Sequence, residues 1–129
     1  MKPILKMMLL DVENETVSEL DVQDDLDEFY RLLHCDCIDI VERTVAGRQF
    51  TFVVDDFGLL KENPKIAALD DTWNPMLIGN LLICHTDFDS CELTALSDDD
   101  VRYLKSHIHT ISTRQFPDGY PMLLSVDYA

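Results

Sequence analysis

Cysteine is the residue type in this sequence best suited to bind a soft metal ion such as zinc. The four cysteines are Cys35, Cys37, Cys84 and Cys91. A structural zinc site needs four thiolate or imidazole ligands, and paired ligands usually enclose two to four residues. Here the two pairs enclose one and six residues, so they are weak ligand candidates. A site could still assemble if Cys37 and Cys84 ended neighbouring strands, but the spacing favours cytosolic thiols that fill the core, with no metal or cofactor.

Side chains for other kinds of catalysis are also poorly arranged. Asp87, Asp89 and Glu92 alternate as cation ligands can, but the glycine and later glutamate of an EF-hand loop are absent. Ser90 lacks the flanking glycines of a nucleophile elbow. Cys84 is followed directly by a histidine, and adjacent side chains of a strand point to opposite faces. A Cys–His pair assembled by the fold stays open, but the sequence favours a protein that is not an enzyme.

The charge of the chain excludes several classes of partner. Its 25 Asp and Glu residues against 10 Lys and Arg residues give a formal net charge of −15. Such a surface repels nucleic-acid phosphates and anionic lipids. No run approaches the roughly 20 apolar residues of a membrane-spanning helix, and the apolar run at residues 4–12 is too short for a signal peptide. We therefore expect a cytoplasmic protein that binds neither nucleic acid nor membranes directly and whose partner is a basic protein surface.

The acidic residues are segregated along the chain. Nine acids and no Lys or Arg lie between Lys6 and Arg31, and eight acids and no Lys or Arg lie between Lys65 and Arg102. The densest parts fall where two helices are predicted to begin. If both helix starts lie on one side, they form an acidic face that could imitate phosphates and block a host or defence protein. The residues of this predicted face are Asp21, Asp24, Asp25, Asp27, Glu28, Asp98, Asp99 and Asp100.

Two other functions remain open. Tyr30, Phe57 and Trp73 could line a crevice between the sheet and the segment 55–75, where their rings would stack on a base. A protein of that kind would sequester a nucleotide or another small molecule. The other alternative is a structural or scaffold protein, in which the last strand could mediate a homodimer.

Hydrophobic periodicity locates the elements in the first half of the chain. An apolar run at 4–12, followed by a turn and by alternation over 16–22, predicts an N-terminal hairpin. Leu26, Phe29, Tyr30 and Leu33 recur at helical spacing and predict a helix that ends near residue 34. β-Rich runs at 37–45 and 49–54 predict a second hairpin with its turn at residues 46–47.

The second half is less regular. Residues 55–75 predict a loop with one helical turn near 66–69, and residues 77–85 predict a buried strand. A short strand is expected at 91–96, and Ser97 is expected to cap a helix over 98–109. An edge strand is expected at 122–126. Together these elements predict a single α+β domain over 1–129, with an antiparallel or mixed sheet of five to seven strands and two main helices packed on it.

The order of these elements, with three short motifs, resembles a known family. The motifs are Gly-Leu-Leu-Lys-Glu-Asn-Pro at 58–64, Ile-Gly-Asn-Leu-Leu-Ile at 78–83 and Leu-Ser-Asp-Asp-Asp-Val at 96–101. They are similar to the domain of unknown function 3846 family of phage and mobile-element proteins. The resemblance covers about residues 4–109 and leaves 110–129 as a C-terminal strand extension. It implies a mobile element in a bacterial host and carries no activity with it.

Overall fold

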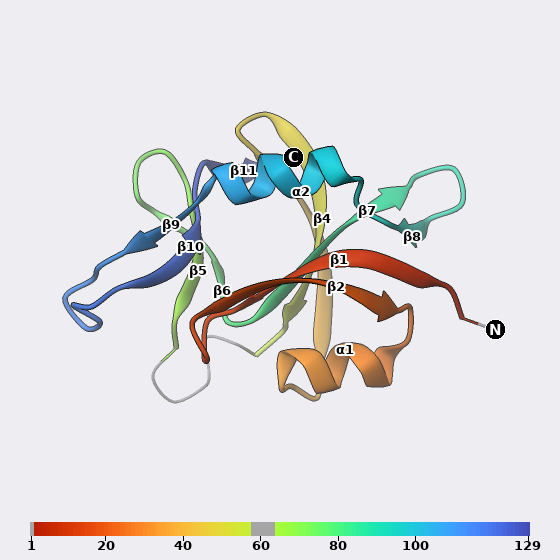
Figure 1. Cartoon of the computed structure of the whole chain (residues 1–129), viewed down its shortest axis with the longest axis horizontal. Coiled ribbons are helices and arrows are strands. Elements are labelled where there is room, and N and C mark those ends of the chain that lie inside the picture. Colours follow the sequence, from red (N-terminus) through yellow and green to blue (C-terminus); the bar gives the residue numbers. More distant parts are fainter. Residues whose placement is uncertain (1, 58–63) are drawn as a thin grey trace.

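The computed structural model describes residues 2–57 and 64–129, and these contain two helices and eleven strands (Figure 1). The chain opens with β1 (Ile4–Asp11) and β2 (Thr16–Gln23), which form the predicted antiparallel hairpin. The predicted second hairpin is β3 (Ile38–Val45) with β4 (Arg48–Asp55). Between the two hairpins lies β7 (Leu81–Asp87), which pairs antiparallel with β1 on one side and with β4 on the other.

Two short strands complete this large sheet. β8 (Glu92–Thr94) pairs with the end of β7, and β11 (Val126–Tyr128) pairs with β3. The seven strands run in the order β11-β3-β4-β7-β1-β2, with β8 beside β7. Every pairing within this sheet is antiparallel.

A second sheet of four strands has the order β6-β5-β10-β9. Its members are β5 (Ile66–Leu69), β6 (Pro75–Ile78), β9 (Ile108–Ile111) and β10 (Tyr120–Leu123). β5 and β10 are parallel, and the other pairings are antiparallel. The α+β class is therefore correct, but the prediction of one sheet is wrong, because the short strands of the second half pair with one another.

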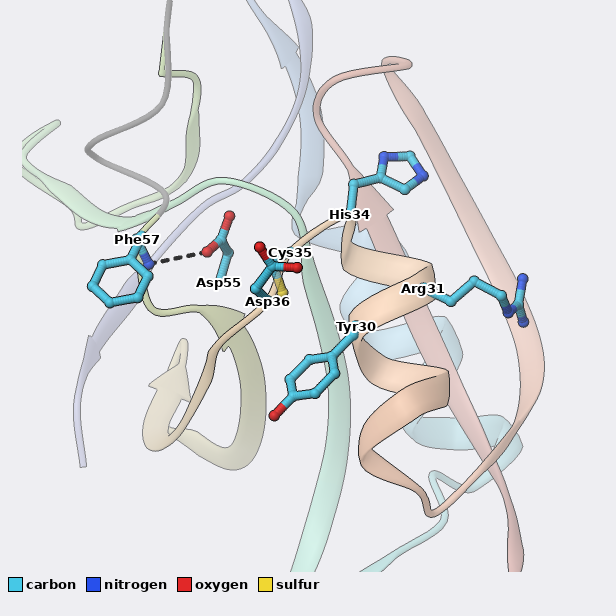
Figure 2. A pocket seen from close by; sticks show the side chains of 7 residues that line it. All are labelled: Tyr30, Arg31, His34, Cys35, Asp36, Asp55 and Phe57. Carbon is cyan, nitrogen blue, oxygen red and sulfur yellow. Dashed lines mark hydrogen bonds between the residues drawn. The ribbon is translucent and has the colours of Figure 1, made fainter.

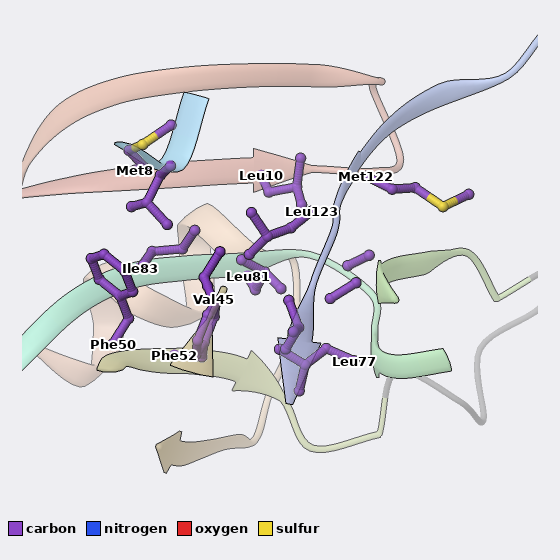
Figure 3. Close-up of a cluster of buried hydrophobic side chains, with 14 of the residues drawn as sticks. Met8, Leu10, Val45, Phe50, Phe52, Leu77, Leu81, Ile83, Met122 and Leu123 are labelled. Atoms are coloured by element: carbon purple, nitrogen blue, oxygen red, sulfur yellow. The ribbon is translucent and has the colours of Figure 1, made fainter. Parts of the chain in front are cut away.

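The two helices pack on opposite faces of the large sheet. α1 (Leu26–Leu33) buries Phe29 and Leu33 in a cluster with Met7, Leu9 and other side chains on one face. α2 (Asp98–Ser106) packs against the other face, where the main core also receives side chains from the small sheet (Figure 3). Neighbouring residues of β1 therefore belong to different clusters, as the alternation of a strand requires. No helix of the described residues is long and apolar enough to cross a membrane.

Four predicted boundaries in the second half are wrong. Residues 66–69 form β5, not a helical turn, and residues 77–85 divide at Gly79, whose φ of 89° separates β6 from β7. The second helix ends at Ser106, and β9 follows. The tail forms two strands, of which β10 lies between β5 and β9 and only β11 is at an edge. Residues 58–63 of the expected loop and of the first family motif lie outside the described residues.

Candidate binding surface around helix α1

Helix α1 is held to the sheet by few side chains. Its eight residues begin after Asp25, whose backbone is extended, and end at His34, whose φ of 54° places it in the left-handed region. Phe29 and Leu33 are its buried residues. An eight-residue helix is about 12 Å long and about 10 Å wide, whereas six strands span roughly 25 Å. The helix therefore leaves part of this face of the sheet uncovered.

One uncovered region lies at the C-terminal end of α1 and is called the tyrosine hollow. It has a volume of about 420 Å³ and is lined by Tyr30, Arg31, His34, Cys35, Asp36, Asp55 and Phe57. Figure 2 shows Tyr30 and Phe57 on the same side of the helix, with Asp36 and Asp55 between them, while Arg31 and His34 point away. The Phe57 amide donates a hydrogen bond of 3.0 Å to Asp55, and the Phe57 ring is 51% exposed.

The second region lies at the N-terminal end of α1 and is called the leucine hollow. It has a volume of about 400 Å³ and is lined by Lys2, Asp24, Asp25, Leu26, Phe29, Ile40, Cys91, Glu92 and Leu93. Leu26 is 53% exposed and Ile40 is 47% exposed. Leu26 and Tyr30 are four residues apart, so both hollows open on the same side of the helix. Together they form a surface of exposed apolar side chains edged by carboxylates.

These hollows lie in the part of the chain that the comparisons identify. A family model described as a domain of unknown function, DUF3846, matches residues 5–109. The chain belongs to the DUF3846 family. The match agrees with the segment predicted from the sequence motifs. No curated protein and no solved structure matches the chain. The DUF3846 segment contains α1 and every lining residue of both hollows except Lys2.

The aromatic crevice predicted from the sequence is correct in part. Tyr30 and Phe57 line the tyrosine hollow together. Trp73 does not join them, because it lies in the turn between β5 and β6 and lines a separate small hollow. Leu26 and Ile40 were not predicted from the sequence to be surface residues. The alternation of β3 places Ile40 on one face of the sheet but does not show whether a helix covers it. Only the short length of the predicted helix could have indicated that part of this face stays exposed.

The eight acids of the predicted acidic face are divided between two faces of the DUF3846 fold. Asp24, Asp25, Asp27 and Glu28 lie at the start of α1, and Asp98, Asp99 and Asp100 lie at the start of α2 on the opposite face. Asp21 lies opposite Lys6 in the β1–β2 register. Both helices nevertheless begin at the end of the molecule where β1 starts, with Lys2 beside Asp25 and Lys6 beside Asp98 (Figure 1), so a common acidic side stays a prediction.

Basic side chains are also interleaved with these acids. Lys6 pairs with Asp98, Arg48 lies 3.2 Å from Asp99, and His85 lies 2.9 Å from Asp100. The hydrogen bond from Lys6 lowers the pKa of Asp98. On the α1 face, the hydrogen bond from Lys2 lowers the pKa of Asp25, and Glu28 pairs with Arg31 at 2.7 Å. Asp24, Asp27 and Glu92 have no ion pair with a described residue.

The fold does not assemble the cysteines into a metal site. Cys37 precedes β3 and Cys84 lies within β7, and β4 separates these two strands. Cys84 is buried in the cluster beneath α1, and desolvation raises the pKa of its thiol to about 12. Cys91 is exposed at the β7–β8 turn. Within residues 2–57 and 64–129, no three His, Cys, Asp or Glu side chains are placed to hold a metal ion.

Proposed function

We propose that this protein is a non-catalytic binding protein that docks on a basic surface of another protein through the α1 side of its large sheet. The observation that carries the proposal is the row of exposed apolar side chains at the two hollows, within a chain of net charge −15. Exposed apolar patches with polar rims mark interaction sites. The acidic rim adds long-range attraction for a basic partner and raises the rate of encounter.

The partner class follows from the chemistry of this surface. Apolar side chains of the partner would bury Leu26, Ile40 and Phe57, while its lysines and arginines would face Asp24, Asp27 and Asp36. A host or defence protein that binds nucleic acid carries such a basic surface. We propose in addition that the acidic protein itself belongs to a phage or another mobile element. Binding of such a partner does not require the acids to imitate an extended array of phosphates. One face that combines apolar and acidic side chains supplies the attraction.

Capture from a bacterial lysate, with identification of the bound proteins, tests this proposal. The binding variant combines Leu26→Ser, Ile40→Ser and Glu92→Gln. The control variant combines Asp21→Asn and Asp118→Asn, which removes two exposed charges that line neither hollow. We expect basic proteins to be captured by the wild type and the control and lost by the binding variant.

Salt gives a second readout of the same capture. Exposed charges are screened within about 10 Å at 0.1 M salt and within about 3 Å at 1 M. Capture should therefore fall steeply over this range. Equal capture by the binding variant and the wild type, or capture that is constant with salt, would reject the proposal. Circular dichroism of each variant before the assay confirms that it is folded.

A second candidate function is the binding of a small molecule in the tyrosine hollow. Its volume of about 420 Å³ lies within the range of known ligand sites, and two aromatic rings line it. Its carboxylates, Asp36 and Asp55, favour a cationic or neutral ligand. Native mass spectrometry of gently purified protein would detect a bound ligand, and a clean mass of the chain alone would remove this candidate.

A further inference from the structure

Trp73, the only tryptophan of the chain, lies exposed at a turn outside the surface described above. The turn joins β5 to β6 and is on the other side of the molecule from α1 (Figure 1). The Trp73 side chain is 61% exposed. Tryptophan is enriched among the residues that dominate binding energy at interfaces, because one rigid ring buries a large area. Exposed at this turn, Trp73 is available to contact a partner.

The turn holds Trp73 in a fixed position. The Asp70 carboxylate accepts hydrogen bonds from the amides of Thr72 and Asn74 at 2.9 and 2.8 Å, and also from the Thr72 hydroxyl at 2.9 Å. The backbone adds bonds between Trp73 and Asp70 at 3.1 Å and between Asp70 and Asn74 at 3.0 Å. Trp73 has a φ of 66°, in the left-handed region. The indole is thus presented by a preorganised loop, which lowers the entropy lost on binding.

Trp73 is one of five residues that line a small cavity, called the tryptophan hollow. It has a volume of about 130 Å³ and is lined by Asp70, Asp71, Trp73, Leu124 and Ser125. Two of these residues are held by backbone hydrogen bonds of 2.8 Å, from Leu124 to His107 and from Ala46 to Ser125. The lining residues include a tryptophan and two aspartates, and no Lys or Arg is among them. The hydrogen bonds of the turn lower the pKa of Asp70, so it is ionised at neutral pH.

We infer that the tryptophan hollow binds the guanidinium group of an arginine side chain from another protein. A guanidinium is planar, stacks on an indole face and pairs with a carboxylate. Asp70 is occupied by the turn, so Asp71 is the carboxylate available to the guanidinium. The size of the hollow suits one side chain and not a whole peptide. This site is separate from the α1 surface, and either one can fail without the other.

The indole N–H signal of Trp73 in a two-dimensional ¹H–¹⁵N NMR spectrum reports directly on this site, because the chain contains no other tryptophan. The probe is a blocked Gly-Arg-Gly peptide, titrated into the ¹⁵N-labelled full chain. We expect a saturable shift of the indole signal. The matched control peptide has citrulline in place of arginine, which keeps the shape and removes the charge, and it should give no saturable shift.

Substitution of the carboxylate provides the second arm. Asp71→Asn should weaken the apparent Kd about threefold, the effect of an exposed ion pair. Asp118→Asn, which removes an exposed charge from the β9–β10 turn, should leave the Kd unchanged. A shift that never saturates, an equal response to the citrulline peptide, or an equal loss in the two variants would overturn the inference. The unchanged amide spectrum of each variant shows that the turn is folded.

Discussion

Cys84 and Leu33 offer a direct test of how α1 is attached to the sheet. Both belong to the buried cluster under the helix, and each is fully buried. Leu33→Ala in such a site costs 2–5 kcal/mol, and we take about 3 kcal/mol. If α1 opens as a local unit, this cost appears in the opening equilibrium of the helix. Since every 1.4 kcal/mol is a factor of ten, opening should become about a hundredfold more frequent.

Thiol labelling resolved by mass spectrometry measures this opening. In the closed protein, the Cys84 pKa of about 12, against the ordinary 9.0, lowers the thiolate fraction about a thousandfold at pH 8. Exposed Cys91 should therefore label first. In Leu33→Ala, labelling of Cys84 should rise about a hundredfold under conditions where the whole protein stays folded. A urea titration of the same variant gives its global free energy of unfolding.

The matched control is Leu104→Ala, which removes the same side chain from an equally buried site on the opposite face. It should lower global stability by a similar amount, about 3 kcal/mol, and leave labelling of Cys84 nearly unchanged. Equal acceleration in the two variants would show that Cys84 becomes accessible only by global unfolding. In that case α1 is not a separate unit, and the reasoning above is refuted.

Three further predictions concern stability. Ser97→Ala removes the cap of α2 and should cost about 1 kcal/mol in urea denaturation, whereas Ser97→Thr should cost less. The pKa of Asp98 is lowered by Lys6, so its contribution to stability is present above the ordinary pKa of 3.8 and is lost as the pH falls through the lowered value. Asp98→Asn should therefore flatten the acid limb of the stability curve, and a variant with an unchanged limb would contradict this. Gly119→Ala should cost about 2 kcal/mol of thermal stability, because Gly119 has a φ of 77° and an added Cβ would lie 3.0 Å from the Ile111 carbonyl oxygen.

The sequence correctly predicted those elements that depend on interactions between residues close together in the chain. Ser97 and Asp100 form the reciprocal capping bonds expected from their spacing. The two hairpins have turns of the expected position, because alternation and turn residues act over a few neighbours. The wrong predictions concern segments whose structure depends on pairing with strands far away in the sequence. β5 contains Ala67 and Ala68, which carry no strand signal, and it forms because β6 and β10 pair with it.

The candidate site shows the same division. The helical spacing of Leu26 and Tyr30 correctly placed them on α1. Their relation to Ile40 depends on which face of β3 the helix covers, which no local pattern encodes. The charge runs were correctly assigned to helix starts, where negative side chains favour the helix dipole. Whether the two helix starts lie on one side of the molecule depends on topology, and here the two helices pack on opposite faces of the large sheet.

The last two strands have a consequence for the synthesis of the chain. β10 bridges β5 and β9, and β11 pairs with β3 only three residues later. Both sheets therefore stay incomplete on the ribosome until the segment 120–128 has emerged. Until then β3 and β5 present open strand edges that can pair with other nascent chains. Expression in the presence of a chaperone that shields such edges should consequently give more native protein.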